Sequence, residues 1–118
     1  MKSCAAILLS LFVCTTVFAI EPVSLTPEEA LDHFDQLAIV RGVVKEIVTD
    51  SGGNTYVSFG GKLPDIMFSG FIFPMDLGKF PNLDSFVGKK VEIEGKISYH
   101  YRRARIVMTS PAQIRLSE

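Results

Sequence analysis

The sequence has no tryptophan and only two cysteines, Cys4 and Cys14, in 118 residues. Both cysteines lie in the N-terminal apolar stretch, so the rest of the chain has no thiol for a disulfide or for nucleophilic catalysis. The stability of that remainder must come from its packed core. Small secreted domains usually contain disulfides, and doing without them is more typical of a bacterial periplasm than of an animal extracellular module.

Long apolar runs are missing beyond the N-terminus. Lys2 precedes the apolar run Ala5–Phe18, which is shorter than the about 20 residues that a membrane-spanning helix needs. The run is followed by the small residue Ala19, which suits signal peptidase. We therefore expect a signal peptide over residues 1–19, and a periplasmic or secreted protein with no stable membrane span after cleavage. A retained N-terminal anchor and lipidation at Cys14 are the alternatives.

An excess of positive charge is also missing. The chain has 12 Lys and Arg against 13 Asp and Glu, for a net charge of −1, and loss of Lys2 with the signal peptide makes this −2. Nucleic-acid-binding domains are commonly basic overall, so any polyanion binding here must rest on a local patch. Residues 20–118 are enough for a single domain, since most domains need about 100 residues to bury a sufficient core.

Catalytic motifs are absent as well. His33 and His100 have no third ligand at metal spacing, and neither Ser58 nor Ser69 has the strand-turn-helix context of an activated serine. Gly60-Gly61-Lys62 lacks the full spacing of a phosphate-binding loop. We therefore expect no catalytic residues, no metal and no cofactor, and a protein that is not an enzyme.

The first element predicted after the leader is a short helix. Thr26-Pro27-Glu28-Glu29 combines a Thr cap, a Pro at the first helical position and a Glu three residues after the cap. With Ala30, Leu31 and Phe34 as an apolar stripe, the pattern predicts a helix over Pro27–Phe34 that packs on the elements that follow.

Five segments then have the composition of β-strands, rich in Val, Ile and aromatic residues or alternating between charged and apolar side chains. The predicted strands are Leu37–Val48 with a bend at Gly42, Asn54–Phe59, Ile66–Phe73, Lys89–Tyr99 and Arg103–Thr109. A turn is predicted at Asp50–Gly53, a loop at Gly60–Asp65, a turn or short helix at Pro74–Phe80, and a turn at Asp84–Val87.

This order of elements predicts an all-β fold, a five-stranded OB-fold barrel with a short N-terminal helix and a short helix or turn between strands three and four. A five-strand meander and a small SH3-like barrel are the competing architectures. Four motifs carry a resemblance over nearly the whole chain after the leader: Ala30-Leu31-Asp32-His33-Phe34, Val40-Arg41-Gly42-Val43-Val44, Gly88–Ile97 and Ser110-Pro111-Ala112-Gln113-Ile114. On these motifs the chain resembles bacterial OB-fold domains of the tRNA-anticodon-binding-like, nucleic-acid-binding superfamily.

The resemblance implies a binding face on strands two and three, rimmed by the loop between strands one and two and by the hairpin between strands four and five. The hairpin is basic and aromatic, a composition that suits phosphate contacts and base stacking. The candidate ligand-binding residues are Arg41, Tyr56, Tyr99, Tyr101, Arg102, Arg103 and Arg105. Equally, such arginines can simply keep an exposed hairpin from pairing with another chain. Most of the strand phenylalanines Phe59, Phe68, Phe71 and Phe73 are expected to fill the core.

Two function classes remain open. The first is a module that binds single-stranded nucleic acid or another oligoanion through the hairpin and sheet face. The second is a protein-interaction or envelope-associated module that uses an apolar patch around Leu63, Ile66, Met67 and Met75, favoured by the acidic net charge. An oligosaccharide is a third candidate partner.

Overall fold

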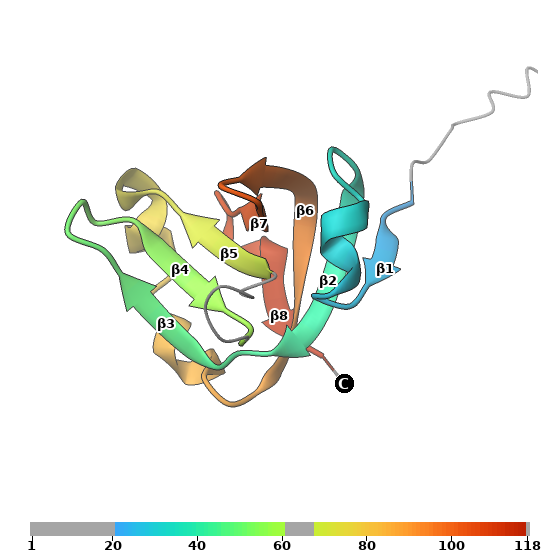
Figure 1. Ribbon diagram of the computed structural model, residues 1–118. Helices are drawn as coiled ribbons and strands as arrows, with labels where there is room; N and C mark the ends of the chain where they lie inside the picture. Colours follow the sequence, from blue (N-terminus) through green and yellow to red (C-terminus); the bar gives the residue numbers. More distant parts are fainter. Residues whose placement is uncertain (1–20, 61–67, 118) are drawn as a thin grey trace, which may run out of the picture.

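The computed structural model describes residues 21–60 and 68–117. Within these ranges the protein is all-β, with eight strands and four short 3-10 helical turns (Figure 1). The strands are β1 Val23–Leu25, β2 Leu37–Val43, β3 Glu46–Thr49, β4 Thr55–Ser58, β5 Phe68–Ile72, β6 Lys90–His100, β7 Arg103–Val107 and β8 Ile114–Leu116. The helical turns are η1 Glu29–Asp32, η2 Pro74–Lys79, η3 Leu83–Phe86 and η4 Pro111–Gln113. The predicted all-β class is confirmed.

The strands pair in the order β1-β2-β6-β7-β5-β4-β3, and β8 adds to β6. The β1–β2 and β5–β7 pairs are parallel, and the other ladders are antiparallel. Only Val44 and Lys45 separate β2 from β3, which lie near opposite ends of this path. The sheet therefore curls around its core, although no ladder joins β2 to β3 among the described residues.

The predicted long strand Leu37–Val48 is divided into β2 and β3, and the division follows Val43 rather than falling at Gly42 itself. The chain instead changes partners at the next two residues: the Val44 N–H donates to the Lys89 carbonyl at 3.0 Å, and the Lys45 N–H donates to the Ser58 carbonyl at 2.8 Å. Glycine is needed at position 42 for space, since a Cβ there would lie 2.7 Å from Cδ1 of Phe59.

The predicted helix over Pro27–Phe34 is shorter than expected. Its cap forms, because the Glu29 carboxylate accepts from the Thr26 N–H at 3.2 Å and from the Thr26 hydroxyl at 3.0 Å. Only Ala30 of the predicted stripe is buried, whereas 58% of Phe34 is exposed. The helix does not continue to Asp35, because the Asp35 N–H donates to the Ile97 carbonyl of β6 at 2.8 Å instead of to a carbonyl one turn earlier.

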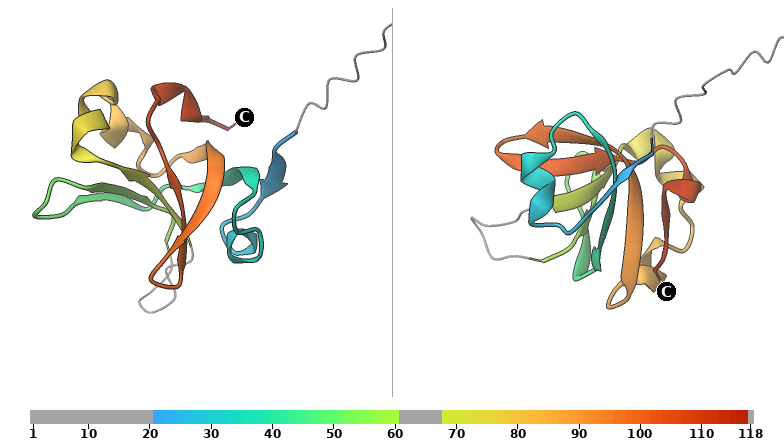
Figure 2. Two further views of the ribbon diagram at one scale, coloured as in Figure 1. Left: turned by 90° about the horizontal axis from the view of Figure 1, so that it is seen from above. Right: turned by 90° about the vertical axis from the view of Figure 1, so that its right-hand side faces the viewer.

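The remaining predictions differ from the structure mainly at strand ends. β4, β6 and β7 fall within a few residues of the predicted strands, and β5 matches where the predicted strand is described. η2 and η3 lie where a short helix and a turn were predicted. The strands β1 and β8 and the helical turn η4 were not predicted. In its left view, Figure 2 shows the β3–β4 turn and the β6–β7 turn projecting from the sheet in different directions.

The core lies between the curled faces of the sheet. Five strands contribute core side chains that are at most 1% exposed, among them Val40, Val57, Phe68, Ile93, Ile97 and Ile106. Each such side chain contributes about 1.5–3 kcal/mol when fully buried. The core therefore holds β4, β5 and β7 rigidly together, and these strands carry the candidate site on their other face.

Candidate functional site

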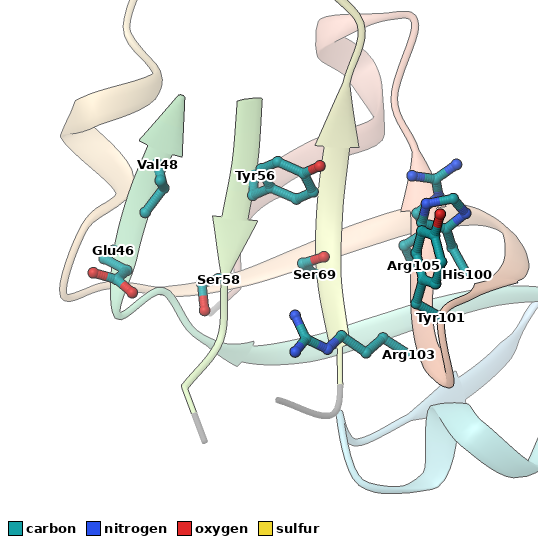
Figure 3. A pocket seen from close by; sticks show the side chains of 9 residues that line it. All are labelled: Glu46, Val48, Tyr56, Ser58, Ser69, His100, Tyr101, Arg103 and Arg105. Atoms are coloured by element: carbon teal, nitrogen blue, oxygen red, sulfur yellow. The ribbon is translucent and has the colours of Figure 1, made fainter. Parts of the chain in front are cut away.

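A groove of about 330 Å³ lies on the outer face of four strands and on the hairpin that joins β6 to β7 (Figure 3). Its lining side chains alternate along each strand with side chains that enter the core, as the pleat of a strand requires. They are Glu46 and Val48 of β3, Tyr56 and Ser58 of β4, Ser69 of β5, Arg103 and Arg105 of β7, and His100 and Tyr101 of the hairpin.

Strand register builds a polar row across the groove. Glu46 lies opposite Ser58, Ser58 opposite Ser69, and Ser69 opposite Arg105. The two serines are small, so the middle of the row is hollow, while its two ends carry opposite charges. Three strand spacings separate the ends by roughly 14 Å along the sheet, which is too far for an ion pair. In Figure 3 the Arg103 side chain extends from β7 toward β4 and β5.

An aromatic cluster lies beside this row. The Tyr56 and Phe71 rings are 5.1 Å apart and the Phe71 and Phe73 rings 4.8 Å apart, both edge to face. Phe71 is 3% exposed, so it is buried as expected for most strand phenylalanines, but it does not belong to the main hydrophobic cluster. It lies opposite Tyr56 in the β4–β5 ladder and packs with Tyr56 and Phe73. Tyr56 remains half-buried and Phe73 is 40% exposed, so both present ring surface to a ligand.

Arg105 is held in place by this cluster. Its guanidinium carbon lies 4.2 Å from the centre of the Phe71 ring, a cation–π contact that orients the planar group. Its Nε is buried and makes no hydrogen bond to any described residue. A buried donor without a partner is costly, so the Arg105 side chain is held in the groove at a cost in stability.

The hairpin turn beside the groove has a strained backbone. Tyr101 and Arg102 have φ angles of 49° and 64°, and His100 pairs with Arg103. Two central residues with positive φ define a type I′ turn, which strongly prefers Asn and Gly. The rings of His100 and Tyr101 meet edge to face at 4.3 Å, and Tyr101 is 84% exposed. The positive φ angles of Tyr101 and Arg102 therefore lower the stability of the turn, which places an aromatic and a basic side chain at the rim of the groove.

Of the seven candidate residues from the sequence, four line this groove: Tyr56, Tyr101, Arg103 and Arg105. Arg102 lies in the adjoining turn and does not line it. Tyr99 does not line the groove, and its ring packs edge to face on Phe34, with the ring centres 6.2 Å apart.

Arg41 also lies elsewhere, on the surface formed by β2, β6 and β8. Its Nε is 2.8 Å from Glu92 Oε1, and Arg115 Nε is 3.0 Å from Glu92 Oε2. Burial alone would raise the pKa of Glu92, but the hydrogen bond and charge of Arg41, with those of Arg115, lower it below its usual value. Arg41 therefore serves a structural ion pair and does not extend the groove.

Sequence reasoning overlooked Glu46 and Val48 and treated Ser58 and Ser69 only as candidate nucleophiles. The signal that identifies them is strand alternation, since Glu46 and Val48 flank the inward-leaning Ile47 and Ser58 follows the buried Val57. Among the described residues neither serine hydroxyl forms a hydrogen bond with His100, and Ser58 Oγ accepts from the Gly60 N–H at 3.5 Å.

A second groove, of about 380 Å³, lies between η2, η3 and the start of β8, and it is mainly apolar. The predicted apolar patch cannot be placed on either surface, because Leu63, Ile66 and Met67 lie outside the described residues, and its fourth member, Met75, is 85% exposed on η2. The described residues contain no group of three or more potential metal ligands. Within the same ranges no helix is long and apolar enough to cross a membrane.

No family model matches this chain, and no curated protein matches it. Solved structures do. A putative aspartyl-tRNA synthetase from Leishmania major Friedlin is similar at a TM-score of 0.52 and 10% identity, over 88% of this chain and 22% of the synthetase. This chain thus spans about a fifth of that enzyme. An OBody, AM1L10, bound to hen egg-white lysozyme, has a TM-score of 0.46 and 17% identity, over 85% of this chain and 88% of the OBody. At such identities the likeness to the synthetase shows the fold alone.

Proposed function

We propose that this protein is an OB-type binding module without enzymatic activity. The strand order supports this: with β2 and β3 counted as the two halves of one bent strand, the remaining β4, β5, β6 and β7 pair as in a five-stranded OB barrel. The parallel β5–β7 pair and the helical turns between β5 and β6 fit the same scheme. The fold likeness to part of a tRNA synthetase agrees with it.

The ligand we propose is single-stranded nucleic acid, bound in the groove on β3, β4, β5 and β7. The observation that carries this proposal is the Arg105 guanidinium, packed on Phe71 beside Tyr56, with a buried Nε that has no partner among the described residues. Oriented arginines bind phosphate oxygens in pairs of parallel hydrogen bonds, and exposed aromatic rings stack bases of any sequence.

In this account Arg103 and Arg105 hold the phosphates while Tyr56, Phe73 and Tyr101 offer ring surface to the bases. Because the whole chain is slightly acidic, affinity comes from this local cluster, and the association should have a modest salt dependence. Each phosphate contact changes the slope of log K against log salt by about −0.7 for a single strand.

The test is fluorescence anisotropy with labelled oligothymidylate at low and moderate salt. We expect Arg103→Ala and Arg105→Ala each to weaken binding about tenfold or more, as the loss of a charge-assisted hydrogen bond does, and to flatten the salt slope. Arg41→Ala is the matched control, since it removes the same charge from the surface formed by β2, β6 and β8. Equal affinity in all three variants, or no binding by the wild type, would sink the proposal.

We also propose that the protein acts in the periplasm or outside the cell after removal of residues 1–19. This rests on the apolar run Ala5–Phe18 and on Ala19 after it. Mass spectrometry of protein recovered from a periplasmic fraction should then give a chain that begins at Ile20. Recovery of the intact chain from the membrane fraction would contradict cleavage.

A further inference from the structure

Glu46 carries a charge opposite to that of the other charged residues that line the groove. The other charged lining residues are Arg103 and Arg105, with His100 beside them, so the groove otherwise suits an anion. Glu46 is exposed on β3, at the opposite end of the polar row from Arg105, and it forms no ion pair among the described residues. An unpaired carboxylate repels phosphates, so in this position it weakens backbone binding unless it meets a hydrogen-bond donor on the ligand.

The bases are the part of a nucleotide that can supply such a donor. A carboxylate only accepts hydrogen bonds, and it has two oxygens that accept side by side. In a single strand the Watson–Crick edges are exposed to the protein. Guanine presents two adjacent donors there, N1–H and the N2 amino group. Thymine and uracil present a single N–H between two carbonyl oxygens, which a carboxylate repels. Glu46 therefore matches guanine best and thymine or uracil worst.

The geometry of the row allows one nucleotide to reach both of its ends. Ser58 and Ser69 leave the centre hollow between Glu46 and Arg105. Tyr56 lies two residues before Ser58 on the same face of β4 and borders this hollow, so a base can lie against its ring. A phosphate at the β7 arginines would then leave the base extended across β5 and β4 toward β3, with its hydrogen-bonding edge at Glu46.

We propose that Glu46 is the specificity-determining residue of this groove, and that it selects guanine over thymine or uracil by accepting hydrogen bonds from the guanine edge. This inference rests on the proposed binding of single-stranded nucleic acid. It assigns base preference to a residue on β3, whereas the arginines of β7 bind every sequence alike.

The experiment compares a short labelled oligothymidylate with the same oligomer carrying one central guanine. Wild-type protein should bind the guanine-containing strand about tenfold more tightly, as expected for a bidentate contact to one base. Glu46→Gln should bring the two affinities within about twofold of each other, mainly by tightening oligothymidylate binding as the repulsion disappears. Asp84→Asn is the matched control, because it removes an equal charge from an exposed position on η3 and should keep the preference. The thermal midpoint of Glu46→Gln should equal that of the wild type, since Glu46 is exposed.

The outcomes separate the two proposals. Binding of both strands with equal affinity by the wild type overturns the role of Glu46 and leaves the nucleic-acid proposal standing. A preference that survives in Glu46→Gln also overturns that role. Failure of the wild type to bind either strand overturns the proposed function itself.

Discussion

The guanidinium carbon of Arg105 lies 4.2 Å from the centre of the Phe71 ring, on the face of the sheet opposite the core. The contact joins two unusual side chains. Phe71 is buried apart from the main hydrophobic cluster, and Arg105 has a buried Nε without a partner among the described residues. Phe71 is in turn flanked by Tyr56 and Phe73. The aromatic cluster thus orders the Arg105 side chain before a ligand binds, so binding does not lose the conformational entropy of that long side chain.

Replacing Phe71 with leucine tests this preorganisation. The substitution keeps an apolar side chain of similar size, so the free energy of unfolding should fall by less than about 1.5 kcal/mol. The cation–π contact, worth about 0.5–2 kcal/mol, disappears and no longer orients the guanidinium, so oligothymidylate binding should weaken about two- to thirtyfold. Urea unfolding and anisotropy titrations measure the two quantities. Phe68→Leu is the control. Phe68 lies on the opposite face of β5, in the core, so this change should leave affinity unchanged.

Relieving the strain of the hairpin turn should raise stability and lower affinity for the ligand. Tyr101→Asn with Arg102→Gly places the residues favoured by a type I′ turn at the two positive-φ positions. Relief of the left-handed strain should raise the free energy of unfolding by about 1–2 kcal/mol. The same change removes an exposed ring and a positive charge from the rim, so affinity should fall. A variant that gains stability and keeps full affinity would show that the turn residues have no part in binding.

Gly95 in β6 marks a close approach between strands. A Cβ at this position would lie 2.5 Å from Cγ2 of the fully buried Ile106 and 3.1 Å from Nε2 of Gln113. Gly95→Ala should therefore lower the free energy of unfolding by about 1–3 kcal/mol, as overpacking does. Gly78→Ala is the matched control, because a Cβ there would meet no atom of the described residues within 4 Å, and it should stay within about 0.5 kcal/mol of the wild type. Chemical unfolding of the two variants gives the comparison.

Stability should decrease in acid, because protonation of Glu92 removes its ion pairs with Arg41 and Arg115. The pKa of its carboxyl is below the usual 4.5 in the folded protein, because Arg41 and Arg115 outweigh the effect of burial. A lowered folded pKa adds stability above the unfolded pKa, and this contribution is lost as the pH falls from about 4.5 through the folded value. Hydrogen bonds from Thr26 and from Asn54 lower the pKa values of Glu29 and Asp50 in the same direction.

The variant Glu92→Gln isolates this term. It should be less stable than the wild type at neutral pH, and the difference should shrink as the pH falls below about 4.5 and through the lowered folded pKa of Glu92, where the wild type loses the contribution. Urea midpoints measured across that range provide the test. A constant difference at every pH would mean that the ion pairs of Glu92 do not account for the acid sensitivity.

Local pattern was enough to predict the all-β class, the β6–β7 hairpin and most strand positions, because alternation and turn residues act over a few neighbours. Alternation also separates the phenylalanines of β5: Phe68 faces the core, while Phe71 and Phe73, an odd number of positions away, face outward. Applied strictly, the same rule would have assigned Phe71 to the outer face.

The features that sequence did not predict depend on register between distant segments. Arg41 lies opposite Glu92, 51 residues later, and no local pattern shows that this pair removes Arg41 from the candidate site. Likewise, the break of the first long strand follows from backbone hydrogen bonds to Lys89 and Ser58, and Glu46 joins the site through its alignment with Ser58. Strands as short as β1 carry too few side chains to show a period.

The most direct test of the account is to follow the backbone amide resonances of the purified protein by NMR while a short oligothymidylate is added. We predict that the largest, saturable shifts map to Tyr56, Ser69, Arg103 and Arg105 around the charged groove, and that they disappear in Arg105→Ala. Shifts centred on the apolar groove at Leu83 and Ile114, or no shifts at low salt, would contradict the claim that this face of the sheet binds single-stranded nucleic acid.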